Sequence, residues 1–203
     1  AINYKYIDYY LEQKNIFKVS YCGSVRLVNN LKLLCDAGKI IKNRGIKKLF
    51  IMIHGSGDQV DKLQKYCIEN DIDNVKLYGW IEKVKIPYVL THSDLCILCY
   101  QNTPLLRFGG SMNKMFEYFA SGKPVVTNAH MAYSFIEKYN CGSELNTNSA
   151  EKLADEIIRF YKMSNRERET FGQRSRQAAE DYDIQLLCER LDKVMEYAEN
   201  RRR

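Results

Sequence analysis

The chain has 203 residues, of which 45% are hydrophobic and 12% aromatic, and its formal net charge is +6. This length and composition suit one globular domain with appended helices. The sequence has no uninterrupted apolar run of the roughly 18 residues that a membrane-spanning helix needs. The charge is small and alternates in sign along the predicted helices, so we expect no nucleic-acid partner and assign the basic stretch at residues 166–176 to solvated surface rather than a lipid-binding face.

The seven cysteines indicate a reduced protein. Their number is odd and most lie in apolar runs, as buried cytosolic cysteines do. Cys96 and Cys99 form a C-x-x-C pair, but an offset of three along a strand places two side chains on opposite faces. We therefore expect both to be core residues and expect no metal site.

The N-terminal segment has no signal-peptide pattern, which predicts a cytoplasmic protein. Peripheral association with the inner face of a membrane is left open for the full-length protein. Because the chain does not begin with methionine, we expect it to be a piece of a longer protein.

Short apolar runs alternate with amphipathic stretches along the chain. The predicted strands are residues 18–22, 49–54, 75–78, 95–100 and 124–127. The predicted helices are residues 28–43, 59–70, 86–92, 112–121, 133–139, 150–163, 165–181 and 184–199. Strands that are apolar throughout and alternate with helices indicate an α/β fold, a Rossmann-like parallel sheet with helices on both faces.

Glycine follows four of the five predicted strands. The segments after these strands are Gly23-Ser24, Gly55-Ser56-Gly57, Gly79-Trp80 and a loop that ends in Gly109-Gly110-Ser111. Because open parallel sheets bind ligands at the carboxyl ends of their strands, this repetition predicts a binding crevice.

The last of these glycine turns precedes the most informative helix. Lys114 and Glu117 are three residues apart and share one helix face. The helix N-terminus and the ammonium suit a phosphate, and the carboxylate suits sugar hydroxyls. A nucleotide diphosphate needs both kinds of group in that order.

These segments resemble the C-terminal, donor-binding domain of GT-B glycosyltransferases of the large retaining family 4, over residues 18–199. The most specific run is SMNKMFEYFASGKPVV at residues 111–126. Four further segments match in the family's order: YCGS at 21–24, HGSGD at 54–58, NVKLYGW at 74–80 and SDLCI at 93–97.

The resemblance implies roles for particular residues. Glu117 corresponds to the second glutamate of the family's E-x7-E motif, which holds the ribose, and Lys114 would lie near the diphosphate. The first glutamate of that motif falls at Gly109, so recognition of the sugar departs from the family. The family's basic residues of the first loop fall at Ser24 and Asn29, and Arg26 is the candidate to replace one of them.

Lys114 and Arg26 are therefore the predicted catalytic residues. The predicted nucleotide-sugar-binding residues are Gly23, Ser24, Gly55, Gly79, Trp80, Gly109, Gly110, Ser111 and Glu117. Three residues stay open: Trp80 packs near the base or buries a loop, and His54 and His130 approach a substrate or are hydrogen-bonded loop residues.

The resemblance also implies the function. We expect transfer of a sugar from a UDP-, GDP- or ADP-sugar to a hydroxyl acceptor with anomeric retention, in polysaccharide or glycan synthesis and without a metal ion. Residues 17–182 would be the nucleotide-sugar-binding domain, residues 1–16 a linker, and residues 183–203 a crossover helix and basic tail. We expect the acceptor-binding N-terminal domain to lie outside this chain, so the chain would bind nucleotide but transfer little sugar alone.

Two other classes of protein are alternative interpretations of the same sequence. One is a non-catalytic or degenerate nucleotide-binding module, which the glycine at position 109 favours. The other is a GT-B sugar-nucleotide epimerase, which would need carboxylates and histidines in the cleft. A dinucleotide oxidoreductase is disfavoured because no G-x-G-x-x-G opens the first helix.

Overall fold

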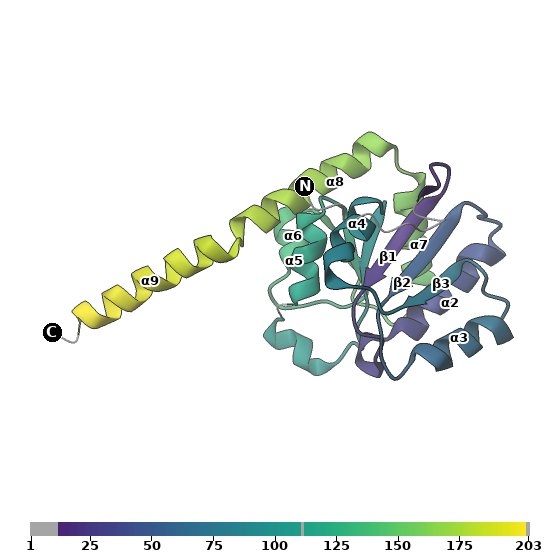
Figure 1. Cartoon of the computed structure of the whole chain (residues 1–203), viewed down its shortest axis with the longest axis horizontal. Coiled ribbons are helices and arrows are strands. Elements are labelled where there is room, and N and C mark those ends of the chain that lie inside the picture. The colour runs from purple at the N-terminus through teal and green to yellow at the C-terminus, as the bar shows by residue number, and fades with distance from the viewer. Residues whose placement is uncertain (1–11, 111, 202–203) are drawn as a thin grey trace.

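Six parallel strands form one sheet in the order β3-β2-β1-β4-β5-β6 (Figure 1). The computed structural model describes residues 12–110 and 112–201. The strands are β1 Phe17–Cys22, β2 Leu49–His54, β3 Val75–Gly79, β4 Leu95–Leu98, β5 Val125–Thr127 and β6 Gly142–Glu144. The strand order reverses between β1 and β4, which is where doubly wound sheets open a crevice at their carboxyl edge.

Helices connect the strands and cover both faces of the sheet. The α-helices are α2 Leu31–Asn43, α3 Val60–Glu69, α4 Ile86–Thr91, α5 Asn113–Ala120, α6 Phe135–Tyr139, α7 Ala150–Lys162, α8 Asn165–Asp181 and α9 Ile184–Asn200. Three short 3-10 helices are η1 Leu27–Asn29, η2 Lys83–Lys85 and η3 Pro104–Phe108.

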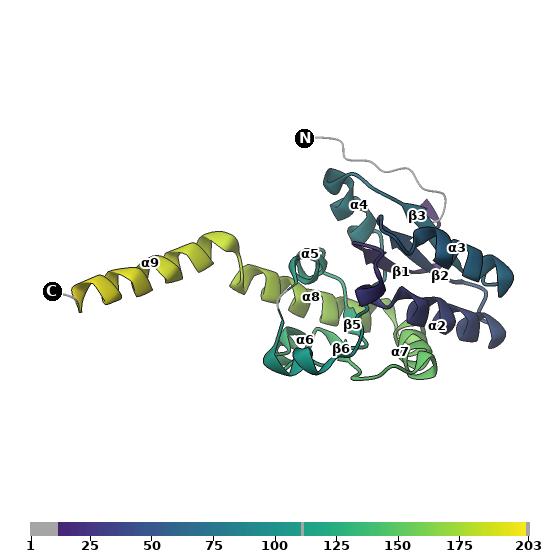
Figure 2. The same cartoon turned by 90° about the horizontal axis from the view of Figure 1, so that it is seen from below.

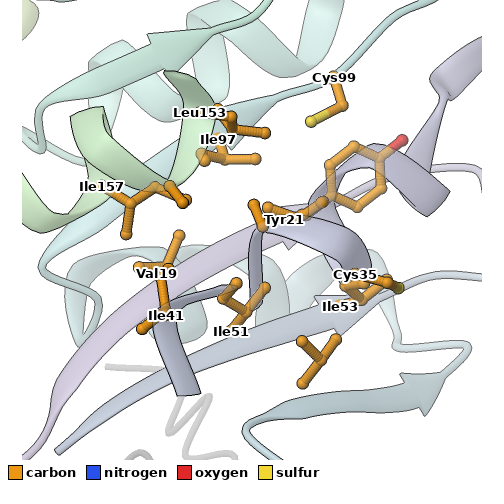
Figure 3. Packing of buried hydrophobic residues seen from close by; sticks show 14 of the residues in the cluster. Val19, Tyr21, Cys35, Ile41, Ile51, Ile53, Ile97, Cys99, Leu153 and Ile157 are labelled. Carbon is orange, nitrogen blue, oxygen red and sulfur yellow. The ribbon is translucent and has the colours of Figure 1, made fainter. Parts of the chain in front are cut away.

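Two hydrophobic cores lie on opposite faces of the sheet. On one face, residues of β1, β2 and β4 pack against α2 and α7, and Figure 3 shows Val19, Ile41 and Ile157 among them. On the other face, Met52 and Leu98 pack against α4 and α5. Figure 2 shows α2 and α7 on one side of the sheet and α4 and α5 on the other. The predicted α/β fold is confirmed.

The cysteines behave as predicted. Six of the seven are buried and only Cys188 is exposed. Cys99 lies in the core on the α2 face, whereas Cys96 lies in the core on the α4 and α5 face, so the C-x-x-C pair straddles the sheet. Within residues 12–110 and 112–201, no three His, Cys, Asp or Glu side chains are grouped as metal ligands.

The structure corrects two predicted elements. The prediction of five strands is wrong, because β6 adds a sixth that pairs with β5. Its sequence, Gly-Ser-Glu, has no apolar run, and its place in the sheet comes from β5 alone. The helix predicted at residues 28–43 is divided, because Asn30 adopts the left-handed conformation between η1 and α2.

The last helix, α9, projects away from the rest of the chain (Figure 1). None of its residues is buried. Its apolar residues recur at helical spacing, and five of the large ones are exposed: Ile184, Leu187, Leu191, Val194 and Met195. In the described part of the chain, none of the helices is long and apolar enough to cross a membrane.

Candidate functional site

The carboxyl edge of the sheet is a closely tied set of loops. The Gly23 N–H donates to the His54 carbonyl at 2.9 Å, and the Gly55 N–H donates to the Gly79 carbonyl at 2.7 Å. A Cβ built on Gly55 would lie 1.7 Å from the Gly23 carbonyl oxygen. Glycine is therefore required at position 55 because two backbones meet there. Through these contacts Gly55 and Gly79 shape the edge of the crevice.

Lys114 lies at the point where the strand order reverses. Its Nζ donates to the Tyr21 hydroxyl at 2.9 Å, and it lies 4.8 Å from the centre of the Tyr21 ring and 5.3 Å from that of Tyr100. Tyr21 belongs to β1 and Tyr100 follows β4. A Cβ built on Gly23 would lie 2.9 Å from the same Nζ. The ammonium thus sits between β1 and β4, beside the predicted glycine turn.

This ammonium is half-buried and has no ion-pair partner among the described residues. Lys114 has no ion pair with any carboxylate of the described residues. Burial lowers its pKa to about 8, and Cys99, Cys22 and Glu117 oppose only part of that change. Burial also raises the pKa of Tyr21 and of Tyr100, so both phenols stay protonated at neutral pH. The site is therefore short of negative charge.

Tyr100 adds a second unsatisfied group. Its hydroxyl is buried and has no hydrogen-bond partner within the described residues. An unpaired buried hydroxyl costs free energy that a polar ligand would recover. The unpaired hydroxyl and the unneutralised ammonium lie together, so an anion with several acceptor atoms suits this position.

Helix α5 is anchored to the end of β1. The Tyr118 hydroxyl accepts from the Cys22 N–H at 2.8 Å and donates to the Cys22 carbonyl at 3.1 Å. Tyr118 is fully buried. No side chain caps the N-terminus of α5, and its first turn carries no acidic residue. This anchoring fixes Lys114 in the second position of the helix, near free N–H groups.

Glu117 faces a pocket between α4 and α5. The pocket has a volume of about 210 Å³, and its lining includes Ile86, Pro87 and Leu90 on one side and Glu117 and Ser121 on the other. Glu117 is half-buried. One carboxylate in a mostly apolar pocket, one helix turn from the Lys114 ammonium, can accept hydrogen bonds from a polar ligand whose flat part packs on the apolar wall.

The other predicted residues of the first and third loops lie on the surface. Arg26 is exposed, and its guanidinium makes no hydrogen bond or ion pair with the described residues. Ser24 is exposed, and its hydroxyl donates to Asn29 Oδ1 at 3.1 Å. Trp80 is 70% exposed, so the alternative in which it buries a loop is wrong. None of these three side chains has a hydrogen bond or ring contact with Lys114.

The glycine turn before α5 is only partly available to a ligand. Gly109 ends η3 with φ +87°, and its N–H donates to the Leu106 carbonyl at 3.0 Å. The expected N–H donor is therefore Gly110. Gly110 packs against Met131, whose Sδ would lie 3.2 Å from an added Cβ. Ser111 lies outside the described residues.

The two histidines at strand ends have different surroundings. His54 is buried and stacks on Tyr78, with ring centres 4.6 Å apart, so it does not reach a substrate. His130 is partly exposed, and its Nδ1 lies 2.9 Å from Glu144 Oε1. It follows β5 at the same edge as Lys114.

Four residues that support the site were not predicted from the sequence. Tyr21, Tyr100 and Tyr118 surround or anchor Lys114, and Asn128 joins the ends of β4 and β5 through two hydrogen bonds with the Tyr100 backbone at 2.8 and 2.9 Å. Their only signal was position, because Tyr21, Tyr100 and Asn128 lie at or just after the ends of predicted strands.

Comparison with known families gives one match. The family model described as Glycosyl transferases group 1 matches residues 7–178. No curated protein matches the sequence.

Comparison with solved structures finds similar folds at low identity. Anabaena HepE in complex with UDP is 18% identical with a TM-score of 0.75, over 90% of this chain and 49% of that chain. A mutant of S. aureus TarM in complex with fondaparinux, α-GlcNAc-glycerol and UDP is 21% identical with a TM-score of 0.69, over 89% of this chain and 36% of that chain. The catalytic domain of the Helicobacter pylori cholesterol-α-glucosyltransferase is 16% identical with a TM-score of 0.61, over 82% of this chain and 98% of that chain. The chain thus spans about half of HepE and about a third of TarM.

Proposed function

The chain belongs to the family of glycosyl transferases group 1, and we propose that it is the nucleotide-sugar-binding part of a retaining glycosyltransferase. We propose a UDP-sugar as its donor, because HepE and TarM have UDP in their complexes. The observation that carries the proposal is the half-buried Lys114 ammonium at the reversal of strand order, where it forms no ion pair with a carboxylate of the described residues.

Each part of the donor has a matching group at this edge. The diphosphate would lie on the Lys114 ammonium and the N–H groups at the start of α5. The ribose hydroxyls would donate to Glu117, and the base would pack in the pocket lined by Ile86 and Pro87. The three groups follow one another in the order in which a nucleotide presents its parts.

Lys114 would also act in the reaction. Negative charge builds on the diphosphate as the bond to the sugar breaks, and a fixed ammonium in a low-dielectric site stabilises that charge more than water does. The chemistry needs no metal ion for this step, because the lysine and the backbone N–H groups supply the positive charge. Arg26 is close enough in sequence to the Gly23 turn to add a second cation from the surface.

A titration of the chain with UDP, GDP and ADP tests the site. We expect UDP to bind and Glu117→Gln to weaken it by about tenfold or more, because a ribose held by a carboxylate loses charge-assisted hydrogen bonds. The thermal midpoint should change little, since Glu117 makes no ion pair with the described residues and acts on Lys114 only at a distance. Glu69→Gln on α3 is the matched control and should leave the affinity unchanged. Equal binding of UDP by both variants and the wild type would overturn the assignment of Glu117.

We propose that α9 packs against the part of the protein that binds the acceptor. Its exposed apolar residues recur along one helix and have no cover in the described chain. The match to this chain covers only 49% of HepE, so the rest of HepE is of a size that could hold such a part. Polysaccharide or glycan synthesis remains the proposed setting.

It follows that this chain alone should transfer little or no sugar. A transfer assay with UDP-glucose and a panel of hydroxyl acceptors should give turnover at the level of the buffer control, although UDP binds. Robust turnover by the isolated chain would show that the acceptor site lies within it. A non-catalytic module, the remaining alternative, predicts nucleotide binding without transfer even in the longer protein.

A further inference from the structure

A second polar pair lies at the same edge of the sheet as Lys114. His130 Nδ1 is 2.9 Å from Glu144 Oε1, and the side chains are 48% and 3% exposed. A buried carboxylate therefore holds a half-exposed imidazole. Nothing in the contacts of Lys114 or Glu117 involves either residue.

The Glu144 carboxylate holds the loop after β5 in place through several hydrogen bonds. It is the last residue of β6, and its Oε1 also accepts from the Met131 N–H at 2.5 Å, while its Oε2 accepts from the Ser134 hydroxyl. Burying a charge is costly unless hydrogen bonds satisfy it, and here three donors from one loop do so. The loop after β5 is thereby fixed, and the His130 ring keeps one orientation.

The pair leaves one ring nitrogen for a ligand. Nδ1 is occupied by Glu144, so Nε2 is the other polar atom of the imidazole, and it has no hydrogen bond to the described residues. Nε2 accepts a hydrogen bond in the neutral ring and donates one in the protonated ring. A hydroxyl can satisfy either form, because it both donates and accepts.

The loop of His130 is joined to the diphosphate end of the site. Asn128, two residues earlier, bonds to the Tyr100 backbone, and the Tyr100 ring lies 5.3 Å from Lys114 Nζ. Met131, the next residue, packs on Gly110. The pocket of Glu117 is lined by residues of α4 and α5, whereas the loop of His130 follows β5 and contacts Gly110, just before α5.

We propose that His130 binds a hydroxyl of the sugar carried on the nucleotide, with Glu144 as its positioning residue. The inference rests on the proposed function. If the nucleoside occupies the pocket of Glu117 and the diphosphate lies on Lys114, the group attached beyond the diphosphate reaches the end of β5. At the end of β5 lies the oriented imidazole of His130. It would take the place of the family's first glutamate, which is Gly109 in this chain.

Comparing UDP with UDP-sugars on the same chain tests this inference. Calorimetry with UDP, UDP-glucose and UDP-N-acetylglucosamine would be run on the wild type, His130→Ala, His130→Gln and Glu144→Gln. His92→Ala is the matched control, because His92 is an exposed histidine at the end of α4, near the opposite edge of the sheet. For the UDP-sugar that the wild type prefers, His130→Ala and Glu144→Gln should raise the Kd about three- to tenfold, the loss of one hydrogen bond.

The pattern across ligands separates this role from a structural one. His130→Ala should leave the Kd for UDP unchanged, His130→Gln should retain part of the sugar affinity, and His92→Ala should leave the Kd for both ligands unchanged. Equal weakening of UDP and UDP-sugar, or no weakening of either, would overturn the inference while the proposed function stands. A wild-type chain that binds no UDP would overturn both.

Discussion

Replacing Lys114 with methionine is expected to stabilise the fold and remove most nucleotide binding. The wild type keeps a half-buried ammonium that has no ion pair among the described residues, and this burial lowers its pKa from 10.5 to about 8. At neutral pH this pKa difference lowers the free energy of unfolding by on the order of 3 kcal/mol, because the folded protein must keep Lys114 charged. Methionine fills similar volume without charge, so we expect a gain of about 1–3 kcal/mol at pH 7. The Tyr21 hydroxyl keeps a partner in the variant, because it donates to the Ser24 carbonyl.

The gain should disappear as the pH rises. Between pH 8 and 10.5 the unfolded chain holds a proton on Lys114 that the folded chain has released. Wild-type stability therefore rises with pH through this window and reaches its lower limit below about pH 8. Urea unfolding of the wild type and Lys114→Met at pH 7 and pH 9.5 measures the change. Lys62→Met, an exposed lysine on α3, should shift stability by less than about 0.5 kcal/mol at either pH.

Binding should change in the opposite direction. Loss of a charged hydrogen-bond donor to a diphosphate should weaken UDP about ten- to hundredfold in Lys114→Met. Wild-type affinity should also fall above about pH 8, where the lysine must take up a proton to bind, and the variant should lack this dependence. A variant that is less stable than the wild type and binds UDP normally would show that Lys114 is a structural residue.

Gly55→Ala is expected to cost about 3 kcal/mol or more of stability. An alanine Cβ at this position would lie 1.7 Å from the Gly23 carbonyl oxygen, and the backbone has φ +152°. The clash is with the Gly23 backbone and not with a side chain that could move aside, so the loops after β1 and β2 must separate to admit a methyl group. Because Gly23 also contacts Lys114, that separation should disturb the donor site as well.

Gly45→Ala is the matched control for this variant. Gly45 also has a positive φ, of +77°, but nothing lies within 4 Å of an added Cβ. It should cost about 1–2 kcal/mol from backbone strain alone. Chemical unfolding of the two variants side by side measures the difference. Equal costs would show that the loops are farther apart at Gly55 than the structure places them.

The fold could be predicted from the sequence because its strands and helices have distinct patterns. β2 and β4 consist almost wholly of apolar residues, and each predicted strand is separated from the next by a segment long enough for a crossover helix, so the parallel sheet follows. β6 could not be predicted, because its three residues are held by pairing with β5 and not by their own propensity. Asn30 likewise interrupts a helix whose apolar periodicity continues through it.

The site was predictable in its two central residues but not in its surroundings. The spacing of Lys114 and Glu117 placed them on one face of a helix after a glycine turn. The partial burial of Lys114 depends on Tyr21 and Tyr100, two residues that are 79 positions apart in sequence and lie at the ends of adjacent strands. The pairing of His130 with Glu144 depends on β6, so no local pattern could reveal it.

A crystal structure of the chain with UDP would show where the diphosphate and the ribose bind. We predict a diphosphate oxygen within about 3.2 Å of Lys114 Nζ and the ribose hydroxyls at the Glu117 carboxylate. A diphosphate bound elsewhere, with Lys114 still bonded only to Tyr21, would contradict this prediction.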